Sequence, residues 1–221
     1  MNKNTFRLAA FVISGIMIVS CSQDNKVPLF NGEDLSNWTG IVFDSISNPD
    51  DVFQVKDGII LVSGEPFGYM ITSESYSNYK LHVEWRWAAE PSNSGVFLHC
   101  QGMEESTWPI CIEAQLKHEN AGGFVLMGHG TGLNIADSTY QVPPEGKRTL
   151  GIKNLEGSSE NSPGEWNVYD ITCDGGDIEL IVNGIVQNIA SESTLKSGQI
   201  ALQSEGGPVE FRNIYIELLG D

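Results

Sequence analysis

The alternation of apolar and polar residues in several short stretches constrains the fold of this chain more than any other feature. Residues 79–87 and 110–117 each place an apolar side chain at every second position, a pattern typical of a half-buried β-strand. Turn-forming dipeptides lie between such stretches, with Asp-Gly at 57–58 and Asn-Gly at 183–184, and both favour tight hairpins. We therefore predict an all-β fold, an antiparallel β-sandwich or jelly roll in a single domain.

Two segments lack this pattern. Residues 140–162 are rich in Pro, Gly, Ser and Glu, so we predict a long surface loop there. Residues 192–196 are compatible with one turn of helix, and no stretch has the pattern of a long amphipathic helix.

The first twenty residues have the features of a bacterial export signal. Lys3 and Arg7 precede an apolar run over residues 8–19, and small residues lead to Cys21. This pattern predicts a lipoprotein signal over residues 1–20, with Cys21 as the lipidated first residue of the mature chain. The alternative is an ordinary signal peptide with a chance cysteine.

A lipid on Cys21 would tether the protein to a membrane without spanning it. We therefore expect an exported protein in the periplasm or at the outer membrane or cell surface. In this division of the chain, residues 21–27 form a linker and residues 28–221 form the jelly-roll domain.

The charge of the chain restricts its partners. The formal net charge is −17, and loss of Lys3 and Arg7 with the signal would make it two units more negative. Nucleic acid is excluded as a partner because phosphate binding requires a positive surface, and acidic polysaccharides would be repelled. We expect a neutral oligosaccharide or glycoside as substrate, and membrane contact only through the lipid at Cys21.

Three cysteines remain after Cys21. The expected export location permits disulfides. Cys100 ends one strand-like stretch and Cys111 begins the next, so the two could be bridged across a loop. Cys173 would then be the odd thiol, buried in its strand.

The polar side of residues 110–117 is the first candidate site. It carries Glu113, Gln115 and Lys117 in succession, which supply an acid or base, an amide and a cation. This combination is the chemistry of a sugar-binding or sugar-cleaving surface. The alternative is an ordinary solvated strand face.

Seven stretches in a fixed order carry a resemblance to a known family. Together they resemble the 3-keto-disaccharide hydrolase domain family, which is common in exported proteins of Bacteroidetes, and the resemblance covers nearly the whole mature chain. No single motif is specific to the family, but the ordered set is. The stretches are residues 29–38, 93–98, 113–116, 164–167, 182–184, 198–203 and 208–214.

The resemblance implies a concanavalin A-like jelly roll and an enzyme that acts on glycosides oxidised to a ketone at carbon 3. The ketone acidifies the hydrogen on carbon 2, so a base can remove it and the carbon-1 substituent is expelled. Addition of water then completes a net hydrolysis. This route requires a general base, stabilisation of the enolate oxygen and an acid for the leaving group, and not the two carboxylates of ordinary glycosidases.

For catalysis we expect Glu113 as the acid or base, His99 for proton transfer and Lys117 as the cation that stabilises the enolate. For each of these three residues the alternative is a purely structural role. Phe97 could stack on a sugar ring, although core packing suits it better. Residues 117–123 and the loop at His129 depart from the commoner family pattern, which leaves the identity of the substrate open. The residues expected to bind substrate are Gln115, Glu84, Arg86, His118, His129 and Gln203.

No cofactor is required by any motif. A divalent metal, Ca²⁺ or another, is compatible with the ligand types His99, His118, Glu84 and Glu113, which are scattered in the sequence. The main alternative to an enzyme is a non-catalytic carbohydrate-binding lipoprotein on the same fold. An adhesive or structural lipoprotein is a third hypothesis.

Overall fold

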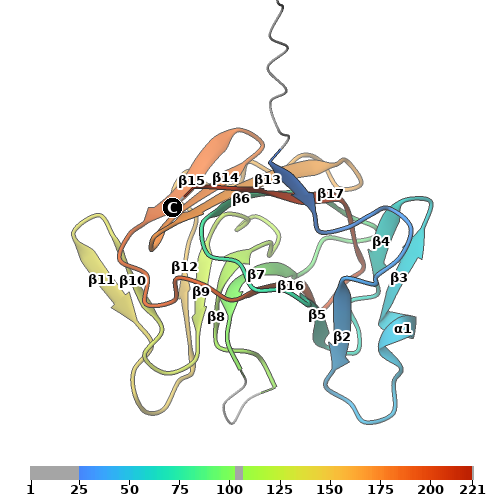
Figure 1. Ribbon diagram of the computed structural model, residues 1–221, viewed down its shortest axis with the longest axis horizontal. Coiled ribbons are helices and arrows are strands. Elements are labelled where there is room, and N and C mark those ends of the chain that lie inside the picture. The colour runs from blue at the N-terminus through green and yellow to red at the C-terminus, as the bar shows by residue number, and fades with distance from the viewer. Residues whose placement is uncertain (1–24, 103–106, 221) are drawn as a thin grey trace, which may run out of the picture.

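The computed structural model describes residues 25–102 and 107–220. It consists of two antiparallel β-sheets stacked on one another, with a separate hairpin at one side (Figure 1). The eight-stranded sheet has the order β15 (Ile185–Ala190), β14 (Asp177–Val182), β13 (Asn167–Asp174), β6 (Tyr79–Trp87), β17 (Val209–Leu218), β4 (Ile59–Val62) and β3 (Phe53–Lys56), and β1 (Lys26–Pro28) also pairs with β17.

The seven-stranded sheet forms the other layer. Its order is β12 (Thr149–Ile152), β9 (Phe124–Met127), β8 (Cys111–Gln115), β7 (Gly95–Cys100), β16 (Gln199–Ser204), β5 (Gly68–Thr72) and β2 (Trp38–Val42). The side hairpin joins β10 (Gly132–Ile135) to β11 (Ser138–Gln141), and a single short helix, α1 (Pro49–Val52), precedes β3. The predicted all-β jelly-roll sandwich is confirmed.

The core lies between the two sheets and explains the alternation in the sequence. From β6, Leu81, Val83 and Trp85 point inward and are at most 1% exposed. From the facing sheet, Val96 of β7 and Ile112 of β8 join the same cluster. Every second residue of each strand therefore enters one dry interior, and the residues between them face the outside of the sandwich.

Several predicted elements match the structure. The hairpin turn at 57–58 connects β3 to β4, and the turn at 183–184 connects β14 to β15. Two predictions are wrong. Residues 140–162 contain β12, a short edge strand that pairs only with β9 and whose apolar pattern is too brief to recognise. Residues 192–196 are not helical, because hydrogen bonds from Thr194 N to Gly132 O and from Leu195 N to Ser193 Oγ hold them in a loop.

The predicted signal segment and Cys21 lie outside the described residues. Strand β1 begins at Lys26, inside the range predicted as linker. Within residues 25–102 and 107–220, none of the helices has the length and apolar character to span a bilayer.

Candidate active site on the seven-stranded sheet

The outer face of the seven-stranded sheet has a buried region near its middle, over β8. Glu113 of β8 points to this face, opposite Phe97 of β7 and Val125 of β9 in the strand register. Its side chain is nevertheless only 2% exposed. The alternative of an ordinary solvated strand face is therefore wrong for this residue.

A glycine makes room for the Glu113 carboxyl group. Gly95 on β7 lies beside it, and a Cβ atom at this position would collide with Oε1, Cδ and Cγ of Glu113. The bare backbone of Gly95 thus allows the carboxyl group to lie flat against the neighbouring strand. Glycine is therefore required at position 95 for Glu113 to keep this position.

The environment of Glu113 favours its protonated form. Burial raises the pKa of this carboxyl group well above its ordinary value, and the nearby charge of Glu205 raises it further. Its Oε1 has no hydrogen-bond partner among the described residues. A buried carboxyl group with a raised pKa and a free oxygen can donate or accept a proton at neutral pH.

A second carboxyl group, Glu205, lies just beyond the end of β16. Its Oε2 accepts hydrogen bonds from Asn93 Nδ2 and Gln203 Nε2, both at 2.8 Å. Burial raises the pKa of Glu205, while the hydrogen bond from Asn93 and the charge of Lys117 act in the opposite direction. Glu205 thus lies near enough to Glu113 for its charge to raise the pKa of that carboxyl group.

Three buried oxygens of this cluster lack partners among the described residues. They are Oε1 of Glu113, Oε1 of Gln203 and Oδ1 of Asn93. Buried polar atoms are almost always hydrogen-bonded in native proteins, so several such atoms in one place indicate a missing partner. All three can accept a hydrogen bond from a hydroxyl group.

Four aromatic rings pack beside this polar cluster. Trp108 lies 4.5 Å from Phe43 and 5.8 Å from Phe97 between ring centroids, and Tyr69 lies 6.0 Å from Phe97. Phe97 is fully buried beneath the others, whereas Phe43 and Trp108 are partly exposed. Since Phe97 is opposite Glu113, the site combines an aromatic wall with convergent polar groups, as ligand pockets do.

Gln115, at the end of β8, and Lys117, just after it, have different roles. Oε1 of Gln115 accepts hydrogen bonds from the backbone N–H groups of Leu116 and Lys117, at 2.9 and 2.8 Å, so it shapes the strand end. The Lys117 side chain is exposed and close enough to Glu205 to lower its pKa. It also lines a polar hollow of about 330 Å³ with His118, Glu119, Asn120, Lys153 and Asn154.

The structure does not bring His99 to the site. His99 has a φ of 53°, and the register between β7 and β16 shifts at this point, which marks a β-bulge. Its ring nitrogens lie 3.0 Å from Leu195 O and 3.3 Å from Ser77 O, and burial lowers the pKa of the ring. The bulge breaks the alternation that placed His99 beside Phe97, so its predicted catalytic role is not supported by the geometry.

Glu84 and Arg86 also lie elsewhere. Both project from β6 on the outer face of the eight-stranded sheet, and Arg212 Nε lies 2.6 Å from Glu84 Oε2. Arg86 pairs with Glu210 at 2.5 Å and lies over the ring of Trp166. The structure therefore places Glu84 and Arg86 on the opposite side of the sandwich and does not bring them together with Glu113.

Of the remaining predicted residues, only Gln203 belongs to the cluster. His118 Nδ1 lies 3.0 Å from Glu160 Oε2 at the rim of the polar hollow. His129 Nδ1 lies 2.6 Å from Pro143 O in its glycine-rich loop. Among the described residues, the partners of these two histidines are Glu160 and Pro143, not Glu113 or Glu205.

No group of three metal-ligand side chains converges in the part of the chain that the structure describes. The four ligand types considered from the sequence are separated, because Glu84 faces outward from one sheet and Glu113 from the other. His99 is held by Leu195 and Ser77, and His118 by Glu160. These four residues therefore do not fit a common metal centre.

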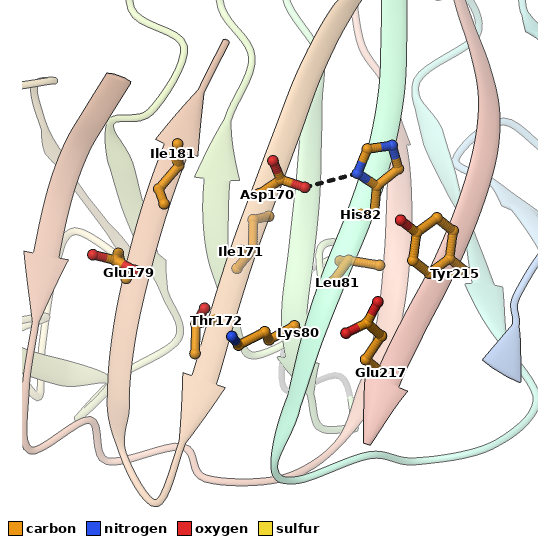
Figure 2. A pocket seen from close by; sticks show the side chains of 10 residues that line it. All are labelled: Lys80, Leu81, His82, Asp170, Ile171, Thr172, Glu179, Ile181, Tyr215 and Glu217. Carbon is orange, nitrogen blue, oxygen red and sulfur yellow. Dashed lines mark hydrogen bonds and ion pairs between the residues drawn. The ribbon is translucent and has the colours of Figure 1, made fainter. Parts of the chain in front are cut away.

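A second hollow, of about 270 Å³, lies on the outer face of the eight-stranded sheet (Figure 2). His82 Nδ1 and Asp170 Oδ1 are 2.7 Å apart there, and the ring of Tyr215 stacks on His82 with a centroid distance of 4.9 Å. Lys26 Nζ in turn lies 4.4 Å from the centre of the Tyr215 ring. These polar groups are engaged with one another, in contrast to those around Glu113.

Sequence reasoning missed Glu205, Asn93 and Trp108. The first two could have been found from the alternation alone. Glu205 follows Gln203 by two residues and Asn93 precedes Gly95 by two, so each extends the outward side of a neighbouring strand. Trp108 lies in the loop before β8, where no periodic signal exists.

Comparison with known proteins agrees with this architecture. A candidate glycosyl hydrolase from Parabacteroides distasonis ATCC 8503 is 21% identical, with a TM-score of 0.62 over 88% of this chain and 94% of that chain. A β-glucanase from Bacillus licheniformis is 11% identical, with a TM-score of 0.57 over 87% of this chain and 97% of that one. The carbohydrate-binding module CBM66 from Bacillus subtilis is 11% identical, with a TM-score of 0.50 over 82% and 95% of the two chains.

At these identities the structural likeness shows the fold alone. Among curated proteins, no sequence matches this chain. The model of the 3-keto-alpha-glucoside-1,2-lyase-like domain matches residues 25–217, nearly all of the described chain. The protein therefore belongs to this family of glycan-processing domains.

Proposed function

We propose that this protein cleaves 3-keto-glycosides or 3-keto-disaccharides at the Glu113 cluster on the seven-stranded sheet. The observation that carries the proposal is the set of three buried oxygens without partners, on Glu113, Gln203 and Asn93. Oriented sugar hydroxyls would supply the missing donors. The aromatic wall that includes Trp108 would cover the apolar side of the ring.

The two carboxyl groups divide the proton transfers between them. Glu113 is held protonated by burial and by the neighbouring Glu205, so it donates a proton to the departing glycosidic oxygen. Burial raises the pKa of Glu205, with the hydrogen bond from Asn93 and the charge of Lys117 acting against it, and Glu205 acts as the base that removes the hydrogen from carbon 2. The ammonium group of Lys117 stabilises the enolate oxygen that forms.

The elimination breaks the bond from carbon 1 to the leaving group and leaves an unsaturated ketone, to which water then adds. The part of the substrate beyond the scissile bond would extend over Lys117 into the adjoining polar hollow. This hollow also carries Lys153 and Asn154, which suit a second polyhydroxylated unit. We propose in addition that the chain is exported and lipid-anchored through Cys21, as its first residues indicate.

The test is incubation of the purified protein with 3-keto-trehalose and 3-keto-lactose, and with the unoxidised disaccharides as controls. Release of 3-keto-glucose from the oxidised substrates alone would support the proposal. Loss of activity in parallel reactions with a chelator would show that the mechanism includes a divalent metal. Absence of turnover together with measurable binding of unoxidised glycans would refute the enzyme and favour a carbohydrate-binding lipoprotein.

A further inference from the structure

Two cysteines face each other beside the candidate active site. Cys100 ends β7 and Cys111 begins β8, and both are buried free thiols, 3% and 0% exposed. Both side chains belong to the packed cluster on the outer side of this sheet that also contains Phe97 and Met127. We propose that Cys100 and Cys111 are a disulfide-forming pair that fastens the Trp108 segment to the sheet next to Glu113.

The strand register places the two cysteines opposite each other. Leu98 pairs with Ile112 in the regular part of the ladder. His99 then adds one residue to β7, and Gln101 N donates a hydrogen bond to Ile110 O at 2.8 Å. Cys100 therefore lies directly across from Cys111, even though the unshifted register would oppose Cys111 to His99.

Directly opposed residues of antiparallel strands have Cα atoms about 4.5–5.5 Å apart. This distance falls within the range that a disulfide can bridge. Both side chains belong to one packed cluster on this face, so they point to the same side of the sheet. The bulge at His99 thus creates the pair, which gives this strained backbone position a structural purpose.

A bond at this place would act on the aromatic wall. It would close the segment between the two cysteines, and that segment carries Trp108, which packs on Phe43 and Phe97. Cys111 shares the outward side of β8 with Glu113, two residues away. The disulfide would therefore fix the position of Trp108 relative to the Glu113 carboxyl group.

The reaction is ordinary thiol–disulfide exchange. A thiolate of one cysteine attacks a sulfur of glutathione disulfide and one glutathione leaves as its thiolate. The second cysteine then attacks the mixed disulfide and releases the second glutathione. The two cysteines lose two electrons and two protons, and one glutathione disulfide is reduced to two glutathiones.

Cys173 provides an internal control. It is fully buried in β13, on the other sheet. The residues opposite it in the ladder are Tyr79 of β6 and Ile178 of β14, so it has no cysteine across from it to pair with. It should remain a thiol under conditions that oxidise the pair.

The experiment is refolding of the purified protein in a mixture of reduced and oxidised glutathione as oxidising as a secretory compartment. Refolding is used because both thiols are buried in the native state. Free thiols are then blocked with a maleimide in denaturant, and peptides are identified by mass spectrometry. We expect one peptide pair joined through Cys100 and Cys111, and full labelling of Cys173.

Maleimide labelling of both Cys100 and Cys111, or glutathione attached to either one, would overturn the proposal. Oxidation of Cys173 to the same extent would also overturn it, because the reaction would then be unselective. A second measurement is urea unfolding in oxidising and reducing buffers, in which the oxidised protein should be the more stable. The double variant Cys100→Ala/Cys111→Ala should show no difference between oxidising and reducing buffers, and a persistent difference would contradict the assignment. None of these measurements depends on catalysis, so the inference can fail or succeed independently of the proposed function.

Discussion

The two outer faces of the sandwich carry similar residues in opposite states. On the eight-stranded sheet, Glu84 and Glu210 are paired with Arg212 and Arg86 and remain partly exposed. On the seven-stranded sheet, Glu113 is buried, and its Oε1 has no partner within the described part of the chain. Both faces are the polar sides of alternating strands, yet only one holds carboxyl groups in a state suited to chemistry.

The difference comes from what surrounds each carboxyl group. An exposed ion pair is screened by water and contributes about 0–1 kcal/mol, so it needs no ligand and serves solubility and register. A buried carboxyl group without a partner costs stability, and such a cost indicates a functional constraint at that place. The packed aromatic cluster and the close approach of Gly95 keep water away from Glu113 and hold it in this state.

The largest expected effect is loss of activity on removing the Glu113 proton donor. Glu113→Gln keeps the shape of the side chain but cannot transfer a proton, so kcat/KM on 3-keto-trehalose should fall by about 10²- to 10⁴-fold. Glu210→Gln on the opposite face is the matched control and should keep wild-type activity. Equal activity of Glu113→Gln and wild type would show that the two faces do not differ in the way proposed.

The second prediction concerns the glycine under the carboxyl group. Gly95→Ala places a methyl group against Glu113 and must displace it, so we expect at least a tenfold loss of kcat and about 1–3 kcal/mol of stability. Gly151→Ala on β12 of the same sheet meets nothing within 4 Å and should change neither. Activity would be assayed with 3-keto-trehalose, and stability by urea unfolding.

The third prediction uses the dependence of stability on pH. Burial raises the pKa of Glu113 in the folded protein, whereas an unfolded glutamate titrates near about 4.3. Above that pH the unfolded chain releases this proton first, so the Glu113 contribution to the free energy of unfolding falls, by at most about 1.4 kcal/mol per pH unit. The fall ends once the pH passes the folded pKa.

Glu113→Gln should therefore gain stability relative to wild type as the pH rises from about 4.5. Urea unfolding of both proteins over a pH series would measure the difference. Glu210→Gln should show no such gain, because Glu210 is paired with Arg86 in the folded protein. A constant difference between Glu113→Gln and wild type would mean that the carboxyl group is ionised in the folded protein.

Much of the fold follows from the sequence, because the period of two is a local property. The stretch at 79–87 corresponds to β6 along its whole length, and the turn dipeptides mark two hairpins. The site is only partly predictable from the same pattern. Glu84 and Glu113 look alike in the sequence, since each lies on the polar side of an alternating stretch.

Which of these carboxyl groups is buried depends on contacts between distant parts of the chain. Glu113 is influenced by Glu205 from the end of β16, and Glu84 is paired with Arg212 from β17. The bulge at His99 is a second example, because a single extra residue reverses the side of the strand on which a histidine lies. Neither effect changes the alternation of apolar and polar residues in the sequence, so neither could be predicted without the structure.

The smallest expected effect separates two tryptophans, one on each face. Trp108→Ala removes a ring of the aromatic wall beside Glu113, and an aromatic contact is worth about 0.5–1.5 kcal/mol. We therefore expect KM for 3-keto-trehalose to rise roughly 2- to 13-fold with little change in kcat.

Trp166→Ala removes a ring that lies between Arg86 and Arg212, so it should lower stability by about 1–2 kcal/mol and leave KM unchanged. Steady-state kinetics and urea unfolding of both variants would decide the matter. If Trp166→Ala raised KM as much as Trp108→Ala, sugar binding would have to be assigned to the eight-stranded sheet, and the contrast between the two faces would be reversed.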